Sequence, residues 1–102
     1  MLIHQVYFWL KDPQSSDARD QLKKGLESLL TIETIKSGHI GIPASTPPRE
    51  EVDHSFTFSY QTTFENMDDH EVYQTHTVHL RFVESCEHLW DRVQVYDYSL
   101  AE

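Results

Sequence analysis

Residues 2–10 of the chain read LIHQVYFWL, and large side chains alternate between two faces along this stretch. A period of two in a segment rich in aromatic and β-branched residues predicts a β-strand. Both faces of the strand carry large apolar groups, so we expect both to be covered. Helices can cover the face of His4, Val6 and Phe8. A second subunit is a candidate for the face of Tyr7 and Trp9.

Three helices are expected downstream. Ser15, Ser16 or Asp17 can cap a helix over residues 15–30, in which leucines recur at helical spacing. Asn66 can cap a short second helix, which breaks near residues 74–77. A third helix is expected over residues 78–90, because apolar positions from His79 to Trp90 fall on one helical face.

Three further strands complete the expected elements. Residues 32–42 and 93–100 have β-type patterns, and residues 52–63 show the clearest alternation in the chain. A loop over residues 43–51 contains three prolines and separates the second and third strands.

The expected order is therefore βαββαβ, which predicts an α+β ferredoxin-like sandwich with helices on one face of an antiparallel sheet. The other face is expected to expose Ile3, Tyr7, Trp9, Tyr96 and Tyr98. A patch of this kind on a monomer indicates a partner, and pairing of two identical sheets into a homodimer is the simplest solution.

Composition limits what the chain can be. Its 102 residues suit one domain spanning residues 1–102. The net charge of −9 argues against nucleic-acid and membrane partners, and no apolar run is long enough to span a bilayer. The N-terminus does not have the pattern of a signal peptide, and a lone Cys86 fits a reducing compartment. We therefore expect a cytoplasmic protein.

Seven histidines are many for a chain of this length, and several fall on faces that the periodicity directs inward. Unpaired buried polar groups cost about 1–3 kcal/mol each, so a cluster of them indicates a cavity, bound water or a ligand. A single one is more simply a core histidine with one hydrogen bond. The inward polar residues are His4, His54, His70, Tyr73, His79 and Asp97.

Proton transfer is the chemistry that these residue types favour. A histidine exchanges protons near neutral pH, a tyrosine hydroxyl can hold an enolate oxygen, and Asp97 could fix an imidazole tautomer. Metal binding is the rival, through His76 and His79 with His4 and His54, but this spacing is weak and we expect neither a metal site nor a cofactor. His39 and His88 are expected on the surface, and Cys86 is expected to pack in the core.

Motifs along most of the chain resemble those of the Dabb domain, the stress-responsive dimeric α/β-barrel family. The opening HQVYFWLK of residues 4–11, His54-x-Phe56, Tyr73-x-x-His76-x-x-His79-x-x-Phe82 and the closing segment from Trp90 to Tyr98 carry the resemblance. It implies a ferredoxin-like fold whose sheets pair across a dimer into a barrel.

One plant member of that family is a polyketide cyclase that needs no cofactor. The resemblance implies His79 as general base and Tyr73 as the group that orients the carbonyl. It also implies substrate contacts from His4 and His54, and we add His70, Asp97 and Trp90. Gly25, His70, Gln74 and Val83 depart from the cyclase pattern. This implies a more polar pocket and a different substrate.

Two functions stay open from the sequence. The first is a cofactor-free enzyme that uses acid–base catalysis in a cyclisation, isomerisation or lyase reaction on a small carbonyl compound. The second is a stress-related dimer that binds a ligand or metal, or has a structural role, without turnover.

Overall fold

The chain folds into four strands and three α-helices in the expected order. The computed structural model describes residues 1–102. The elements are β1 (Leu2–Leu10), α1 (Ser16–Leu29), β2 (Ser37–Gly41), β3 (Phe58–Phe64), α2 (Met67–Thr75), α3 (Thr77–Cys86), a 3₁₀ turn η1 (Glu87–Leu89) and β4 (Trp90–Ser99).

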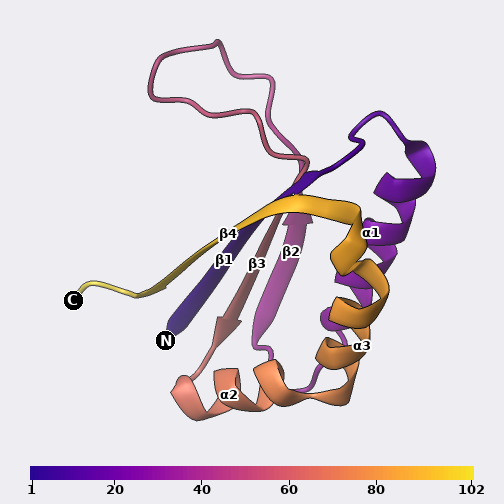
Figure 1. Cartoon of the computed structure of the whole chain (residues 1–102). Coiled ribbons are helices and arrows are strands. Elements are labelled where there is room, and N and C mark those ends of the chain that lie inside the picture. Colours follow the sequence, from indigo (N-terminus) through magenta and orange to yellow (C-terminus); the bar gives the residue numbers. More distant parts are fainter.

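The four strands form one antiparallel sheet in the order β2-β3-β1-β4. The strand that opens the chain, β1, lies inside the sheet between β3 and β4. All three helices cover the same face, and the termini lie at the opposite end of the molecule from α1 and α3 (Figure 1). This arrangement confirms the predicted ferredoxin-like α+β fold.

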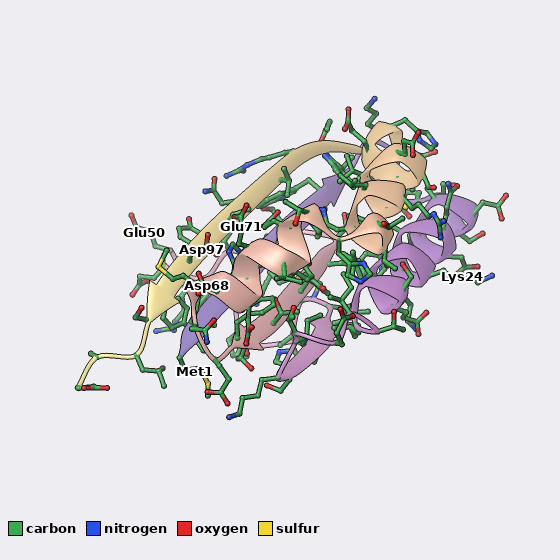
Figure 2. All side chains as sticks on the ribbon, turned by 90° about the horizontal axis from the view of Figure 1, so that it is seen from below. Met1, Lys24, Glu50, Asp68, Glu71 and Asp97 are labelled. Atoms are coloured by element: carbon green, nitrogen blue, oxygen red, sulfur yellow. The ribbon has the colours of Figure 1, made fainter.

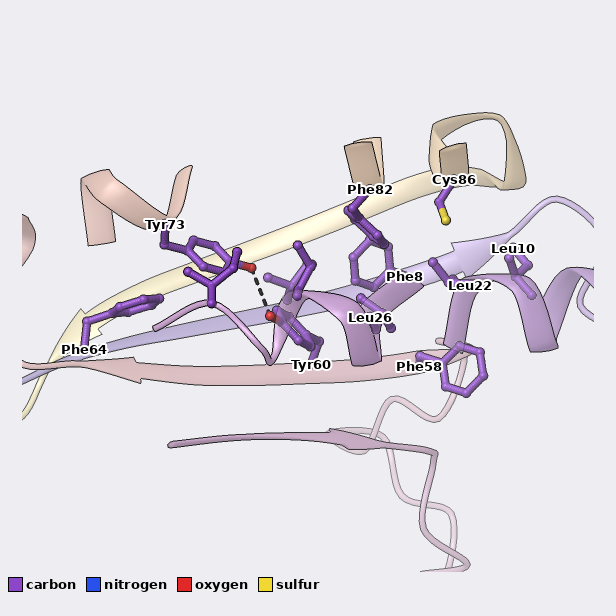
Figure 3. Close-up of a cluster of buried hydrophobic side chains, with 13 residues drawn as sticks. Phe8, Leu10, Leu22, Leu26, Phe58, Tyr60, Phe64, Tyr73, Phe82 and Cys86 are labelled. Atoms are coloured by element: carbon purple, nitrogen blue, oxygen red, sulfur yellow. Dashed lines mark hydrogen bonds between the residues drawn. The ribbon is translucent and has the colours of Figure 1, made fainter. Parts of the chain in front are cut away.

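The core lies between the sheet and the helices. Thirteen buried side chains form one cluster, to which α1 contributes Leu22, Leu26 and Leu29 (Figure 3). Ser15 caps α1 as expected, since its hydroxyl accepts a hydrogen bond from the Ala18 backbone N–H at 3.1 Å. Asn66 caps α2 in the same way through the Asp69 N–H at 2.8 Å. Both predicted helix starts are thus confirmed.

The third strand begins later than the alternation predicts. Residues 52–57 are irregular, and β3 starts only at Phe58. The Asp53 carboxylate accepts a hydrogen bond from the Ser55 backbone N–H at 2.8 Å, which closes a local turn in place of a strand ladder. The expected strand over residues 52–57 is therefore wrong, and His54 is not on the sheet.

The second strand and the third helix are both shorter than expected. After α1, backbone hydrogen bonds link residues three apart up to Ile35, so β2 is confined to Ser37–Gly41. Helix α3 ends at Cys86, and the Lys11 N–H then binds the Leu89 carbonyl at 2.9 Å. That bond joins the chain to the end of β1. Trp90 consequently opens β4 and is not a helical residue.

The helix-free face of the sheet is aromatic, as expected. Tyr96 and Tyr98 are 58% and 48% exposed, and Tyr7 and Trp9 are half-buried beside them. Phe56 joins this group with its ring 5.0 Å from that of Tyr7. Ile3 departs from the prediction, since only 6% of it is exposed.

The three helices of the fold are too short or too polar for any of them to span a bilayer.

Candidate active site

A cavity of about 190 Å³ lies between the sheet and helices α2 and α3. Most of its wall is apolar, and the polar groups come from a few histidine, tyrosine and glutamine side chains. The lining residues are His4, Val6, Phe8, Leu29, Tyr60, Tyr73, Gln74, His79, Phe82, Val83, Trp90, Val93 and Val95. An apolar pocket with a few converging polar groups is the usual form of a small-molecule site.

His4 and Asp97 form a hydrogen-bonded pair at the edge of this cavity. They lie opposite each other on β1 and β4, and His4 Nδ1 is 2.6 Å from Asp97 Oδ1. His4 is 5% exposed, whereas the Asp97 side chain is 44% exposed. The carboxylate can only accept from a neutral imidazole, so Nδ1 carries the proton and Nε2 presents a lone pair. Asp97 thus fixes the tautomer of His4.

His79 opens onto the same cavity from the first turn of α3. Its ring lies 5.0 Å from the ring of Tyr73, which projects from α2. Burial lowers the pKa of His79, and the imidazoles of His4 and His70 lower it further. A histidine of this kind is neutral at pH 7 and has a basic nitrogen.

Tyr73 and Tyr60 share a buried hydrogen bond that the sequence pattern does not predict. Their hydroxyl oxygens are 3.0 Å apart, and each residue is 1% exposed (Figure 3). Burial raises the pKa of Tyr73 to about 12 and that of Tyr60 well above its ordinary value. Both remain neutral phenols. One O–H satisfies the pair, so the other is free to donate to a molecule in the cavity.

In the sequence, Tyr60 is one more aromatic residue of the alternating segment over residues 52–63. Its inward position could be predicted from the alternation with Phe58, but its partner could not. The contact joins β3 to a residue thirteen positions later on α2. Only the packing of α2 on the sheet brings the two hydroxyls together.

His70 lies next to the cavity and does not line it. Its ring is 5.0 Å from that of His4 and 5.2 Å from that of Phe64, and Gln74 contacts its Nε2 at 3.2 Å. Burial, followed by the charge that His4 can carry, lowers the pKa of His70. His4, His70 and Asp97 therefore form one connected group beside the cavity.

Trp90 lines the cavity from the first position of β4. Its ring stacks on Phe82 at 5.7 Å and lies 5.1 Å from Phe8. The wall that it forms is flat and aromatic. The helical spacing of residues 78–90 predicts Trp90 at the end of a helix, whereas it lines the cavity from the first position of a strand.

Two other histidines lie outside this group. The Nε2 of His54 is 2.9 Å from the Thr46 hydroxyl, in the segment between β2 and β3, and His54 does not line the cavity. His76 caps α3, because its Nδ1 accepts from the Val78 N–H at 3.0 Å, and its Nε2 contacts Glu33 at 3.3 Å. Both ring nitrogens of His76 thus have partners within the fold.

Of the residues expected at the site, the structure therefore places His4, Tyr73, His79 and Trp90 around one cavity. His70 and Asp97 contact His4, and His54 lies elsewhere. This arrangement contains a base without charge at neutral pH, a hydroxyl donor and a second imidazole whose tautomer is fixed. Such a set can move protons to and from a bound molecule.

The chain is similar to several known proteins in sequence or in fold. The stress-response A/B barrel domain-containing protein At5g22580 of Arabidopsis thaliana is 29% identical over 83 residues, which are 80% of this chain and 73% of that protein. The crystal structure of At3g17210 from the same plant superposes with a TM-score of 0.81 and 27% identity over 100% of this chain and 97% of that one. A hydroxynitrile lyase from Passiflora edulis reaches a TM-score of 0.81 at 22% identity, over 99% and 94% of the two chains.

A structure from Thermobifida fusca, described as a dimeric ferredoxin-like protein, has a TM-score of 0.77 at 17% identity and covers 97% of this chain and 90% of its own. These similarities below 25% identity show a shared fold. The family model described as Stress responsive A/B Barrel Domain matches residues 2–100. The chain therefore belongs to the stress-responsive A/B barrel domain family.

Proposed function

We propose that this protein is an acid–base catalyst for a small carbonyl compound, with His79 as the base and Tyr73 as the hydroxyl donor. The reaction class is cyclisation, isomerisation or lyase chemistry. The observation that carries the proposal is that His79 and the Tyr60–Tyr73 hydroxyl pair meet at one largely apolar cavity. The hydroxynitrile lyase with the same fold supports lyase chemistry as one of the three options.

The key step is proton abstraction from the carbon next to a carbonyl. A ring nitrogen of His79 takes the proton, and the electron pair left on carbon moves to the carbonyl oxygen. The Tyr73 O–H donates a hydrogen bond to that developing enolate oxygen, and the Tyr60 hydroxyl donates to Tyr73 and holds it in position. The proton on His79 returns to carbon or leaving group when the enolate collapses.

His4 has a supporting role in this scheme. Its Nε2 lone pair accepts a hydrogen bond from a substrate hydroxyl, and Asp97 stabilises any positive charge that the ring acquires. The apolar half of the cavity, with Trp90 and Phe82, holds the part of the substrate that does not react. The ring of His70 packs beside that of His4 and helps to hold it in place.

Exchange of carbon-bound hydrogen tests this step without knowledge of the natural product. Small aryl ketones such as acetophenone and phenylacetone are incubated with the protein in D₂O, and loss of the α-proton signal is followed by NMR. His79→Gln is expected to slow enzyme-dependent exchange by about 100-fold or more. Tyr73→Phe is expected to slow it as well, because the enolate loses its hydrogen-bond donor.

His39→Gln is the matched control. His39 is exposed on β2, so its substitution should leave the exchange rate unchanged. Exchange that persists in folded His79→Gln protein at the wild-type rate would refute the assigned base.

The pH profile of the same exchange follows from the two shifted groups. His79 must be neutral to accept a proton, so the rate falls as pH drops through a pKa that lies below 6.5. Tyr73 stays protonated up to about pH 12, so no alkaline decline is expected before that point. The profile is therefore a plateau with a single acid limb.

A second candidate function is binding of a small apolar molecule without turnover. The largely apolar wall of the cavity favours it, because such a wall retains a ligand by burial alone. Mass spectrometry of the native protein distinguishes the two. A small molecule carried through purification, combined with no α-proton exchange, would favour binding.

We also propose that the protein is a homodimer in the cytoplasm, paired through the helix-free sheet face. The exposed Tyr96 and Tyr98 on that face and the dimeric description of the Thermobifida fusca structure support the pairing. The single buried thiol of Cys86 fits a reducing compartment.

A further inference from the structure

His4, His70 and Asp97 each present one metal-ligating atom, and these three atoms lie within 4.8 Å of one another. The residues come from three different elements, β1, α2 and β4. His4 is the only one of the three that lines the cavity. The cluster therefore adjoins the proposed active site and shares His4 with it.

The backbone fixes these three positions independently of any ligand. The register of β1 against β4 places His4 opposite Asp97. The Asn66 cap and the buried ring of Tyr73 hold α2 on the sheet, and this puts the His70 ring 5.0 Å from that of His4. Donor atoms on packed elements need little reorganisation to bind an ion.

Solvent and charge around the cluster both favour a cation. His4 is buried, but the Asp97 side chain is 44% exposed and gives an ion access from solvent. Helix α2 carries Asp68, Asp69 and Glu71 in its first turns, and Figure 2 shows Asp68, Glu71 and Asp97 along the same side of the molecule. No lysine or arginine forms an ion pair with any of these carboxylates.

The donor set identifies the class of ion. Two imidazoles and one carboxylate suit Zn²⁺ and other divalent first-row transition metals, whereas Mg²⁺ and Ca²⁺ prefer oxygen ligands alone. We propose that His4, His70 and Asp97 bind a divalent transition-metal ion, preferentially Zn²⁺, and leave a coordination position open to solvent.

Binding requires one small rearrangement. The His4 Nδ1 and Asp97 Oδ1 atoms are 2.6 Å apart in a hydrogen bond, whereas neighbouring ligands of a tetrahedral zinc ion are about 3.3 Å apart. The Nδ1 proton of His4 would move to Nε2 through solvent, which frees the Nδ1 lone pair for the ion, and the Asp97 carboxylate would move outward by less than about 1 Å. Asp97 lies on the edge strand with much of its side chain in solvent, so it has room for this motion.

Titration of the chelator-treated protein with Co²⁺ and Zn²⁺ tests the site. We expect saturation at one ion per chain, a cobalt absorption band typical of nitrogen and oxygen ligands in a site of low coordination number, and displacement of Co²⁺ by Zn²⁺. His70→Gln and Asp97→Asn should each weaken binding by about tenfold or more. Both positions are partly exposed, so these variants should fold.

His88→Gln is the control for adventitious binding, because His88 is an exposed histidine on η1. It should leave the affinity unchanged. Failure to saturate at one ion per chain, or equal affinity in wild type, His70→Gln and Asp97→Asn, would overturn the site. A preference for Mg²⁺ over Zn²⁺ would overturn it too. The titration uses no carbonyl substrate, so its result is independent of the proposed catalysis.

Discussion

At the scale of single residues, the two most buried polar groups of the site depend on each other. Tyr60 and Tyr73 meet through their hydroxyls at 3.0 Å with almost no exposure to water. A buried hydroxyl that loses its partner pays the full cost of desolvation. The pair therefore stabilises the packing of α2 on β3 and holds the Tyr73 hydroxyl at the cavity.

Tyr60→Phe and Tyr73→Phe are each expected to lower the free energy of unfolding by about 1–2 kcal/mol, since each leaves one hydroxyl unpaired. The double variant should lose less than the sum, because no unpaired hydroxyl remains. Urea denaturation of all four proteins measures the coupling. Strict additivity would show that the two hydroxyls do not interact in solution.

The residues of the site could be predicted from the sequence only in part. Alternation and helical spacing place His4, His79 and Tyr73 inward, and the structure agrees. The partner of Asp97 could not be predicted, because it depends on the register between the first and last strands. The predicted inward position of His54 is wrong, because the local hydrogen bond of Asp53 replaces the regular strand backbone on which the alternation depends.

At the scale of elements, Gly25 sets how closely α1 and α3 approach. In the sequence this glycine departs from the cyclase pattern, and a glycine inside a helix lowers helix stability slightly. In the structure, a Cβ at this position would lie 2.7 Å from Cys86 Sγ and 2.9 Å from Phe82 Cδ1. The absence of a side chain therefore lets α3 lie against α1 and carry His79 to the cavity.

Gly25→Ala should destabilise the protein by about 1–3 kcal/mol through overpacking, even though alanine favours helices by about 1 kcal/mol. Lys24→Ala, at the exposed neighbouring position, should change stability by less than about 0.5 kcal/mol. Thermal unfolding compares the two. An increase in stability for Gly25→Ala would mean that α3 can move away freely.

The elements differ in how well they could be predicted. Residues 2–10 and α1 have patterns long enough to give both type and bounds. The bounds of β2 and β3 depend on turns formed by local hydrogen bonds, which a periodic pattern does not contain. The change from helix to strand at Trp90 depends on the distant bond between Lys11 and Leu89.

At the scale of the whole molecule, the sheet has two unlike faces. Helices cover one, and the other presents Tyr7, Trp9, Phe56, Tyr96 and Tyr98. Exposed aromatic groups gathered on one surface indicate association. The homodimer that we propose buries this face.

Tyr96→Glu should convert the dimer to a monomer, because it places a charge in the proposed interface. Light scattering coupled to size exclusion should then report a mass near 12.0 kDa in place of about twice that value. Leu80→Glu is the matched control. Its side chain is 57% exposed on α3, comparable with 58% for Tyr96, and its substitution should leave the dimer intact. A wild-type protein of single-chain mass would refute the pairing.

The two tryptophans of the chain lie on opposite faces of the sheet. Trp90 lines the cavity, while Trp9 lies on the helix-free face with the Arg92 guanidinium 4.1 Å from its ring centre. The molecule thus contains two intrinsic fluorophores that sense different events. With Trp9 replaced by phenylalanine, the remaining emission reports filling of the cavity. With Trp90 replaced instead, the emission of Trp9 should report the subunit pairing that we propose, so the two processes can be followed separately by fluorescence.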